Sequence, residues 1–479
     1  MNDQQEPDTA AATASNPQRM PPRPVADEPA NTSSRTPWTL KTSSTLRTEK
    51  SEQETETLAN IHDIMEDEMK GAIIANADEI VDNFLSTSHI RLGGPSSLDD
   101  VLKHLTTKGL YSDTEKKWAD FPSSSGKDCE KNLAMYFEKV ADAASDLFQS
   151  GLPRKHWTAE HATRPVTDKY CDRKPDLAIV TSDAPPAGPE RTWWHILGTL
   201  EVKPDKNDFD EALGQLIESA RLIYSVQPHR RFLLDAILCG EFMTLVLFDR
   251  SGALFTQPFN VHEQPKRFLQ VAVGLLHLND ANRGFDPTVN FTDPTSGTVI
   301  VEGVKHSFDN VIYIEGVVRG RGTACYPIVK DGVPHLVKDS WVDERRENKE
   351  GDIVNDLHSQ TEEENVKKHI PKILADENVL FEGKPDSTAL VRSFISRRSQ
   401  DGKHHEWTDP SMAKVEIREH RRMLMTPVAR NLEDFSCLAE LLTAFIHTAE
   451  STPYCFFKRS NTHILFSHLR NVQPEDDAP

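Results

Sequence analysis

A glycine-rich turn, a lysine and a glutamate follow one another in an order that suits phosphate binding. The turn, Gly320-Arg321-Gly322-Thr323, lies between two runs of strand-forming residues. Glycines lack a Cβ, so backbone amides can approach a phosphate closely. Lys338 ends the next predicted strand and Glu350 begins a predicted helix, so we expect a Lys338–Glu350 ion pair. The candidate nucleotide-binding residues are Gly320, Gly322, Thr323, Lys338 and Glu350.

Each of these residues also has an ordinary structural interpretation. The glycines suit any tight turn, Lys338 suits a solvated strand end, and Glu350 suits an exposed helix charge. Cys325 stands where a third glycine is expected, which predicts a stiffer turn. The shared order of the motifs favours the binding interpretation.

A second candidate site lies upstream, where Asp176 opens one predicted strand and Glu201 and Lys203 end another. Side chains two residues apart on a strand share a face, so Glu201 and Lys203 project together. Two converging carboxylates could hold Mg²⁺ while the lysine steadies a water or a developing negative charge. Gln215 and Glu130 are additional candidates, and the alternative is a surface Glu-Lys pair on a sheet scaffold.

Periodicity predicts the elements that position these residues. Apolar residues at helical spacing predict amphipathic helices over 58–85 and 133–147, and a helix over 209–224. Strands are expected over 177–180, 195–202, 232–238, 243–248 and 254–259, with a hairpin turn at Asp249-Arg250-Ser251-Gly252. A second strand set is expected over 299–301, 311–318, 324–329 and 336–337.

The C-terminal third is less periodic. Residues 376–406 are polar and predict a loop or insertion. Two strand segments are expected at 415–417 and 423–425, followed by a helix over 435–449. Its inward residues are predicted to be Leu438, Leu441, Leu442 and Phe445.

Composition limits the class of protein. The chain has 479 residues, a formal net charge of -20 and six widely spaced cysteines without a CxxC pair. The acidic balance makes nucleic-acid or membrane partners unexpected, and the cysteines favour reduced thiols over disulfides. No apolar run reaches the roughly 18 residues of a membrane span, so we expect a cytoplasmic or nuclear protein. Residues 1–57, rich in Pro, Ser and Thr, predict a disordered tail.

Five motifs in order resemble the fungal-type protein kinase family. They are Phe248-Asp249-Arg250-Ser251-Gly252, Gly284-Phe285-Asp286-Pro287-Thr288, Arg319-Gly320-Arg321-Gly322-Thr323, Val337-Lys338-Asp339-Ser340-Trp341, and the run from Glu419-His420-Arg421-Arg422 to Ala444-Phe445-Ile446-His447. The resemblance covers about residues 170–449. It implies an α/β region joined to a serine/threonine-type kinase domain, with ATP and Mg²⁺ as ligands, Lys338 as the phosphate-binding lysine and Glu350 as its partner.

The resemblance stops where the family places its catalytic loop. After residue 449 there is no His-Arg-Asp motif and no Asp-Phe-Gly motif, so a catalytic base and a metal-binding aspartate are missing. We therefore expect no kinase activity, with nucleotide or partner binding as the remaining role. A pseudokinase and a truncated gene model both stay open, and protein partners are unknown.

Asp176, Glu201 and Lys203 resemble the PD-(D/E)XK nuclease pattern, in which Gln215 and Glu130 would also take part. The alternative function is therefore a magnesium-dependent nuclease-like enzyme, with Lys203 catalytic and Asp176 and Glu201 as metal ligands; a nonfunctional fragment is the third possibility. The expected fold class is a multidomain α+β protein. Its expected parts are a tail over 1–57, a helical and α/β PD-(D/E)XK-like domain over 58–285, an incomplete kinase-like domain over 286–470 (an N-lobe with an incomplete C-lobe), and a polar tail over 471–479.

Overall fold

A computed structural model describes residues 68–93, 96–149, 153–167, 172–362, 364–395, 416–429, 435, 437–439 and 441–446. The tails predicted over 1–57 and 471–479 lie outside these residues. So do residues 58–67 of the first predicted helix and residues 396–406 of the predicted loop. The described part has the mixed helix and strand content that the sequence predicts, and none of its helices has the length and apolar character of a membrane span.

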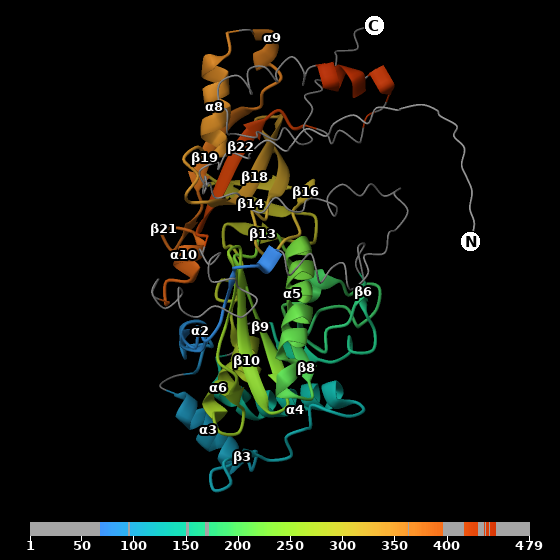
Figure 1. Ribbon diagram of the computed structural model, residues 1–479, viewed down its shortest axis with the longest axis vertical. Coiled ribbons are helices and arrows are strands. Elements are labelled where there is room, and N and C mark those ends of the chain that lie inside the picture. The colour runs from blue at the N-terminus through green and yellow to red at the C-terminus, as the bar shows by residue number, and fades with distance from the viewer. Residues whose placement is uncertain are drawn as a thin grey trace, which may run out of the picture. The chain divides into compact units, whose positions relative to one another are not determined.

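An eight-stranded mixed sheet forms the centre of the α/β region (Figure 1). Its order is β1-β11-β10-β9-β8-β7-β4, and β12 pairs with β10. Strands β8 and β9 are parallel because a helix crosses over between them, whereas β7 and β10 run antiparallel to these neighbours. The strands are β1 (Ile73–Ile74), β4 (Lys155–Thr158), β7 (Leu177–Thr181), β8 (Gly198–Lys203), β9 (Phe232–Cys239), β10 (Phe242–Asp249), β11 (Gly252–Phe255) and β12 (Phe259–Asn260).

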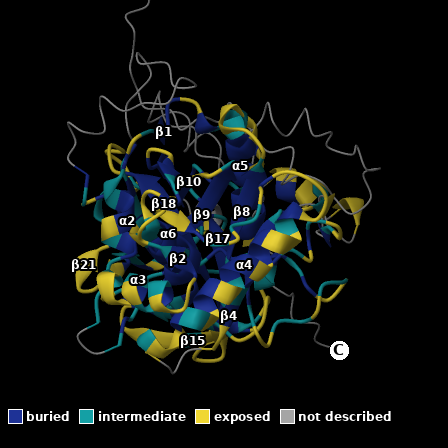
Figure 2. Ribbon diagram, turned by 90° about the horizontal axis from the view of Figure 1, so that it is seen from below, coloured by how far each residue is buried: buried dark blue, intermediate teal, exposed yellow. Residues whose placement is uncertain are grey.

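Helices cover both faces of this sheet, because its strands are apolar on both faces. Leu177 and Ile179 of β7 join one core with helix α4, while Ala178 and Val180 join a second core with helix α5. Figure 2 shows the central strands buried and the outer faces of α3 and α4 exposed. The helices are α2 (Glu79–Phe84), α3 (Leu98–Thr107), α4 (Cys129–Ala144), α5 (Phe209–Val226), α6 (Pro265–Leu269) and α7 (Leu275–His277).

Small elements complete this region. Two-residue strand pairs lie outside the main sheet, and short helical turns connect its elements. These pairs are β2 (Tyr111–Ser112) with β3 (Lys117–Trp118), and β5 (Val166–Thr167) with β6 (Asp172–Arg173). The turns are the 3-10 segments Ser145–Leu147, Trp193–His195 and Lys206–Asp208 and the π-helical segment Gln270–Gly274.

The predicted strands 177–180, 232–238 and 243–248 and the predicted helix 209–224 are confirmed. The predicted helix 133–147 is confirmed as far as Ala144, where α4 gives way to a 3-10 turn. The hairpin turn at 249–252 is also confirmed, since Asp249 and Gly252 are register partners.

Three predictions in this region need correction. Residues 73–74 are strand β1 instead of helix, because Ile73 and Ile74 pair in parallel with β11 and bury side chains in the two different cores. The strand predicted over 195–202 begins only at Gly198, after a 3-10 turn. The strand predicted over 254–259 is two strands, since β11 ends at Phe255 and β12 pairs separately with β10.

A five-stranded antiparallel sheet follows, with the order β16-β17-β18-β22-β19. Helix α8 connects β18 to β19 and contacts β19. A three-stranded sheet, β13-β14-β15, precedes it. The strands are β13 (Val289–Phe291), β14 (Gly297–Val301), β15 (Val304–Phe308), β16 (Tyr313–Ile314), β17 (Ala324–Lys330), β18 (Val333–Asp343), β19 (Lys372–Asn378), β20 (Leu380–Phe381), β21 (Lys384–Pro385) and β22 (Arg418–Thr426), and the helices are α8 (Glu350–Gln360), α9 (Glu364–Lys367) and α10 (Thr388–Val391).

Strand lengths in this region differ from the predictions. The strand predicted over 311–318 shrinks to Tyr313–Ile314, because residues after it fold into the glycine-rich turn. The strand predicted at 336–337 extends over 333–343, since it pairs with strands on both sides. The segment predicted at 423–425 lies within β22, which begins at Arg418. The strand predicted at 415–417 is not found in its described part, since residues 416–417 precede β22, and residue 415 lies outside the described residues.

The loop predicted over 376–406 is wrong for its described part. Residues 372–378 form β19, and β20, β21 and α10 follow before residue 395. Charged residues in β19 hide its strand character from a hydrophobicity pattern, because they pair with β22: Asp376 accepts a hydrogen bond from Arg421 at 2.5 Å. Polar strands of this kind are stabilised by cross-strand pairs instead of burial.

The predicted helix 435–449 is helical at residues 438, 439 and 441–446. Its predicted inward face is wrong: Leu438, Leu442 and Phe445 have exposed fractions of 70%, 60% and 53%, and Leu441 is half-buried. Within the described residues, Ala444 is the buried position of this helix. Helical spacing therefore identified the element but not its packing.

Candidate functional sites

The glycine-rich turn joins β16 to β17. Glu315 and Thr323 close it, because the Thr323 amide donates to the Glu315 carboxylate at 3.0 Å and the Glu315 amide donates to the Thr323 carbonyl at 2.8 Å. Gly322 has φ +49°, and a Cβ there would lie 2.4 Å from Cζ of Arg250. Both the conformation and the close approach of the Arg250 side chain therefore favour a glycine at 322.

The α/β region holds the turn on its other side. The Glu68 carboxylate accepts hydrogen bonds from the amides of Val318 and Arg319 at 2.7 and 2.8 Å. The Gly320 amide donates to the Arg250 carbonyl at 3.1 Å. Four amides of this hairpin, including that of Thr323, are thus engaged by protein oxygens, which leaves the charged side chains beside the turn as the stronger phosphate candidates.

Lys338 lies in the middle of β18, and Glu350 is the first residue of α8. The Lys338 ammonium donates to the Glu350 carboxylate at 2.5 Å, so the predicted ion pair is present. Arg321 of the turn donates to the other Glu350 oxygen at 2.6 Å. Burial raises the pKa of Glu350, but Lys338 and Arg321 outweigh it and hold this pKa at about 2. The pair therefore stays charged at neutral pH, and two cations converge on one carboxylate.

Cys325 does not belong to the turn, which corrects the comparison with a third glycine. It lies in β17 directly opposite Lys338, with its side chain buried. Burial raises the pKa of its thiol to about 11. Cys325 therefore acts as an apolar strand residue beneath the ion pair.

A buried network lies behind Lys338 on the same strand. Asp339 accepts hydrogen bonds from His420 at 2.9 Å and from Arg422 at 2.7 Å, and Arg422 also donates to Asp286 at 2.9 Å. Burial opposes protonation of His420, but Asp339 and a second carboxylate, Asp386, outweigh it and raise its pKa to about 9. The His420 ring stacks on Trp341 at 4.4 Å between centroids. These contacts tie β18 to β22.

Asp286, Asp339 and His420 are also the group of three potential metal ligands found among the described residues, with ligand atoms within 4.8 Å of one another. The Arg422 guanidinium donates to both carboxylates of this group. Charge balance is thus supplied by an arginine and a protonated histidine, and neither can ligate a cation. The donor set suits a structural network and not a metal site.

The upstream site joins Asp176, Glu201 and Lys203 at one end of β7 and β8. Glu201 shares a side-chain hydrogen bond with Asp176, and Asp176 accepts from the Val202 amide at 2.7 Å. Burial and then the Asp176 charge raise the pKa of Glu201 well above its ordinary value, and burial also raises the pKa of Asp176. Both shifts favour the protonated form of these closely spaced carboxyl groups.

Lys203 has a partner that the sequence did not reveal. Its ammonium donates to Glu211 of α5 at 2.6 Å, and Gln215 donates to the same Glu211 oxygen at 3.4 Å. Glu130 of α4 raises the pKa of Asp176 by its charge but does not join Asp176 and Glu201 within a three-ligand group. The structure therefore brings Asp176, Glu201 and Lys203 together, with Gln215 linked through Glu211 and Glu130 farther away.

Sequence reasoning missed several residues of these sites. Arg321 stood inside the glycine motif, and Asp339, His420 and Arg422 stood inside motifs used for the family resemblance. Their clustering could not be found by spacing, because His420 and Asp339 meet only through the pairing of β18 with β22. Glu211 carried a usable signal, since it lies four residues before Gln215 on one helix face.

Comparison with known proteins places the chain in a family. A family model described as fungal protein kinase matches residues 174–453, more than half of the chain. No curated protein matches, and no solved structure matches. The match spans Asp176, Glu201, Lys203, Lys338 and Glu350. The chain belongs to the fungal protein kinase family.

Proposed function

We propose that this chain binds a nucleotide beside Lys338. The observation that carries the proposal is the 2.5 Å contact between Lys338 and Glu350. Lys338 lies on the third strand of its sheet in chain order, and Glu350 lies on the helix after that strand. A protein-kinase N-lobe places its phosphate-binding lysine and orienting glutamate at these positions.

Arg321 and Lys338 would contact the phosphates. Both cations donate hydrogen bonds to the Glu350 carboxylate, and both can also donate to phosphate oxygens. The amides of Val318, Arg319, Gly320 and Thr323 already donate to protein oxygens. We therefore assign the turn the role of positioning the Arg321 side chain. ATP with Mg²⁺ is the ligand that the family implies. Mg²⁺ would bind phosphate oxygens of the nucleotide and keep several water ligands.

The proposal is one of binding, without phosphoryl transfer. Transfer needs an aspartate that accepts the substrate proton and another that binds metal. Neither a His-Arg-Asp nor an Asp-Phe-Gly motif occurs in the printed sequence. We therefore assign no transfer step to the described residues.

Thermal unfolding with ATP and Mg²⁺ tests nucleotide binding. A ligand at about 100 Kd should stabilise the protein by roughly 2.7 kcal/mol. We expect this stabilisation in the wild type, its loss in Lys338→Ala, and its retention in Lys330→Ala, which removes an exposed lysine from β17. Equal stabilisation of all three proteins would place the nucleotide elsewhere.

We propose a second candidate function, a metal-dependent nuclease-like activity at Asp176, Glu201 and Lys203. The shared hydrogen bond and the raised pKa of Glu201 favour it, because two crowded carboxylates are relieved by a divalent cation. Carboxylate oxygens suit Mg²⁺. A bound Mg²⁺ would lower the pKa of a water or stabilise a phosphorane's charge, and Lys203 would orient the phosphate once released from Glu211.

Cleavage assays test this second function. We expect Mg²⁺-dependent cleavage of DNA or RNA by the wild type and by Glu263→Ala, which removes an exposed carboxylate. Glu201→Ala should abolish it. Absence of cleavage across single-stranded and duplex substrates would remove this function from consideration.

A further inference from the structure

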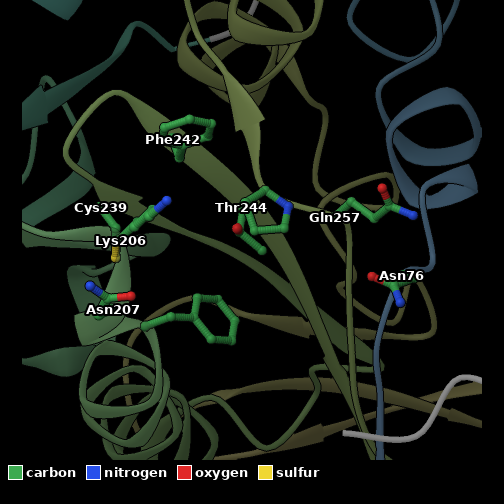
Figure 3. A pocket seen from close by; sticks show the side chains of 9 residues that line it. Asn76, Lys206, Asn207, Cys239, Phe242, Thr244 and Gln257 are labelled. Carbon is green, nitrogen blue, oxygen red and sulfur yellow. The ribbon is translucent and has the colours of Figure 1, made fainter.

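A pocket with a volume of about 570 Å³ opens at the end of β9 and β10. Phe242 lies at one side of it, and Asn76 and Gln257 lie across from Lys206 and Asn207 (Figure 3). Its volume is within the range of small-molecule sites, roughly 300–1,000 Å³. The pocket is separate from the Lys338 site.

The lining suits a flat heterocyclic ring. Phe242 is 36% exposed, so part of its surface is open to a ligand. Exposed aromatic rings of this kind stack on nucleobases without regard to base sequence. The amides of Asn207 and Gln257 each carry a donor and an acceptor, which can pair with the polar edge of a base.

The charges around the pocket are mixed. Lys206 lines it, as does Cys239. Burial, then Asp208 and Asp205, raise the pKa of the Cys239 thiol to about 11, although the Lys203 charge acts in the opposite direction. Charges of both signs near the pocket are compatible with an uncharged base ring.

The pocket also borders the Asp176–Glu201 site. Cys239 is the register partner of Lys203, and the Gly240 amide donates to the Lys203 carbonyl at 2.8 Å. Lys206 and Asn207 lie in the turn that follows Lys203. A ligand with its ring in the pocket could therefore extend its backbone toward Lys203 and Glu201.

We infer that this pocket takes an unpaired nucleobase of single-stranded nucleic acid, with the neighbouring phosphodiester directed toward Glu201. The inference rests on the second candidate function for its substrate class. The inference makes single-stranded nucleic acid the substrate. In a duplex the face of a base is stacked and its edge is paired, so neither can enter the pocket. A free nucleoside has the same ring chemistry but lacks the phosphodiester.

Fluorescence titration tests the inference with the full chain and a short single strand that contains 2-aminopurine. A chelator in the buffer prevents metal-dependent cleavage, so binding is measured apart from activity. Phe242→Ala should weaken binding by about tenfold or more, since loss of base stacking is typically of that size. Phe242→Tyr should restore it, and Phe435→Ala, which removes a phenylalanine 40% exposed outside the pocket, should leave it unchanged.

Further arms separate the outcomes. Tighter binding of the single strand than of its duplex and of free 2-aminopurine riboside supports the inference. Equal affinity of Phe242→Ala and wild type, or equal affinity for duplex or free riboside, overturns it. If Glu201→Ala and wild type are both inactive but Phe242→Ala loses binding, the base pocket stands while the nuclease function fails.

Discussion

The Lys338 site and the Glu201 site differ in how their carboxylates are balanced. Glu350 lies between two cations and has a pKa near 2, whereas Glu201 lies beside another carboxylate and has a raised pKa. Both glutamates lie near a lysine, so residue type alone does not distinguish them. The difference is that Lys338 pairs with its glutamate, while Lys203 pairs with Glu211 instead.

This difference indicates separate tasks. A neutralised ion pair is complete as folded and can orient a lysine toward an added anion. A crowded pair of carboxylates is incomplete in charge and favours an added cation or a proton. This contrast supports our proposals that the first site accepts phosphate and the second a metal ion.

Removal of Asp339, which lies next to Lys338 in β18, should have the largest effect on the free energy of unfolding. Asp339→Ala leaves the Arg422 guanidinium and a protonated His420 buried without their shared carboxylate. Breaking one partner of a buried, hydrogen-bonded ion pair costs about 3–5 kcal/mol. Urea unfolding at neutral pH measures this loss in the free energy of unfolding. Loss of exposed Asp331 in the control Asp331→Asn should cost little, and an equal loss in both variants would contradict the network's role.

The next largest effect should be stabilisation of the protein by Mg²⁺, which should depend on the Glu201 site and not on the Lys338 site. At about 100 Kd, Mg²⁺ without nucleotide should stabilise the wild type by roughly 2.7 kcal/mol. Glu201→Gln should abolish this stabilisation because a neutral amide replaces one ligand, and Glu350→Gln should retain it. Thermal unfolding with and without Mg²⁺ measures both. Stabilisation that survives Glu201→Gln would place the metal elsewhere.

The two sites should also give opposite pH dependence. The Glu350 pKa falls from 4.5 to about 2 on folding, so its stabilisation is present above pH 4.5 and is lost as pH falls toward 2. The Glu201 pKa rises on folding, so the free energy of unfolding should decrease as pH rises above 4.5 through the folded pKa. Glu350→Gln should remove the acid-side loss, worth about 1–3 kcal/mol given its partial exposure.

Glu201→Gln should instead remove the decrease on the rising side. Urea unfolding over a pH series compares both variants with the wild type. Parallel pH profiles of Glu201→Gln and wild type would show that the pKa of the Glu201 carboxyl is not raised in the folded protein.

Much of this contrast could be predicted from the sequence, but not its electrostatics. Strands 177–180, 232–238 and 243–248 were predictable because apolar runs end in polar turns. The acidic pair was predictable because Asp176 and Glu201 stand at the ends of predicted strands, and the Lys338–Glu350 pair because a glycine-rich turn, a strand lysine and a helix glutamate follow one another in order. Strand β1 was not, since two isoleucines buried on opposite faces fit a helical pattern equally well.

Long-range pairings explain what the sequence could not reveal. Arg321 reaches Glu350 from a hairpin turn, and His420 reaches Asp339 across β22. Neither contact follows from local period or composition. Polar strand β19 was hidden for the same reason, because its ladder partner β22 comes later in the chain.

The smallest effect is the one that tests whether Arg321 and Lys338 act together. Lys338→Ala leaves Glu350 bonded to Arg321 at 2.6 Å, and Arg321→Ala leaves it bonded to Lys338. Each single change should therefore cost only about 1 kcal/mol, the size of one hydrogen bond. The double variant leaves the carboxylate without either cation, so its cost should exceed the sum of the two. A double-mutant cycle by urea unfolding measures the excess. If the two costs simply add, Arg321 and Lys338 act on Glu350 independently. The two cations would then not form a joint binding site for an anion, and this contrast with the Glu201 site would be lost.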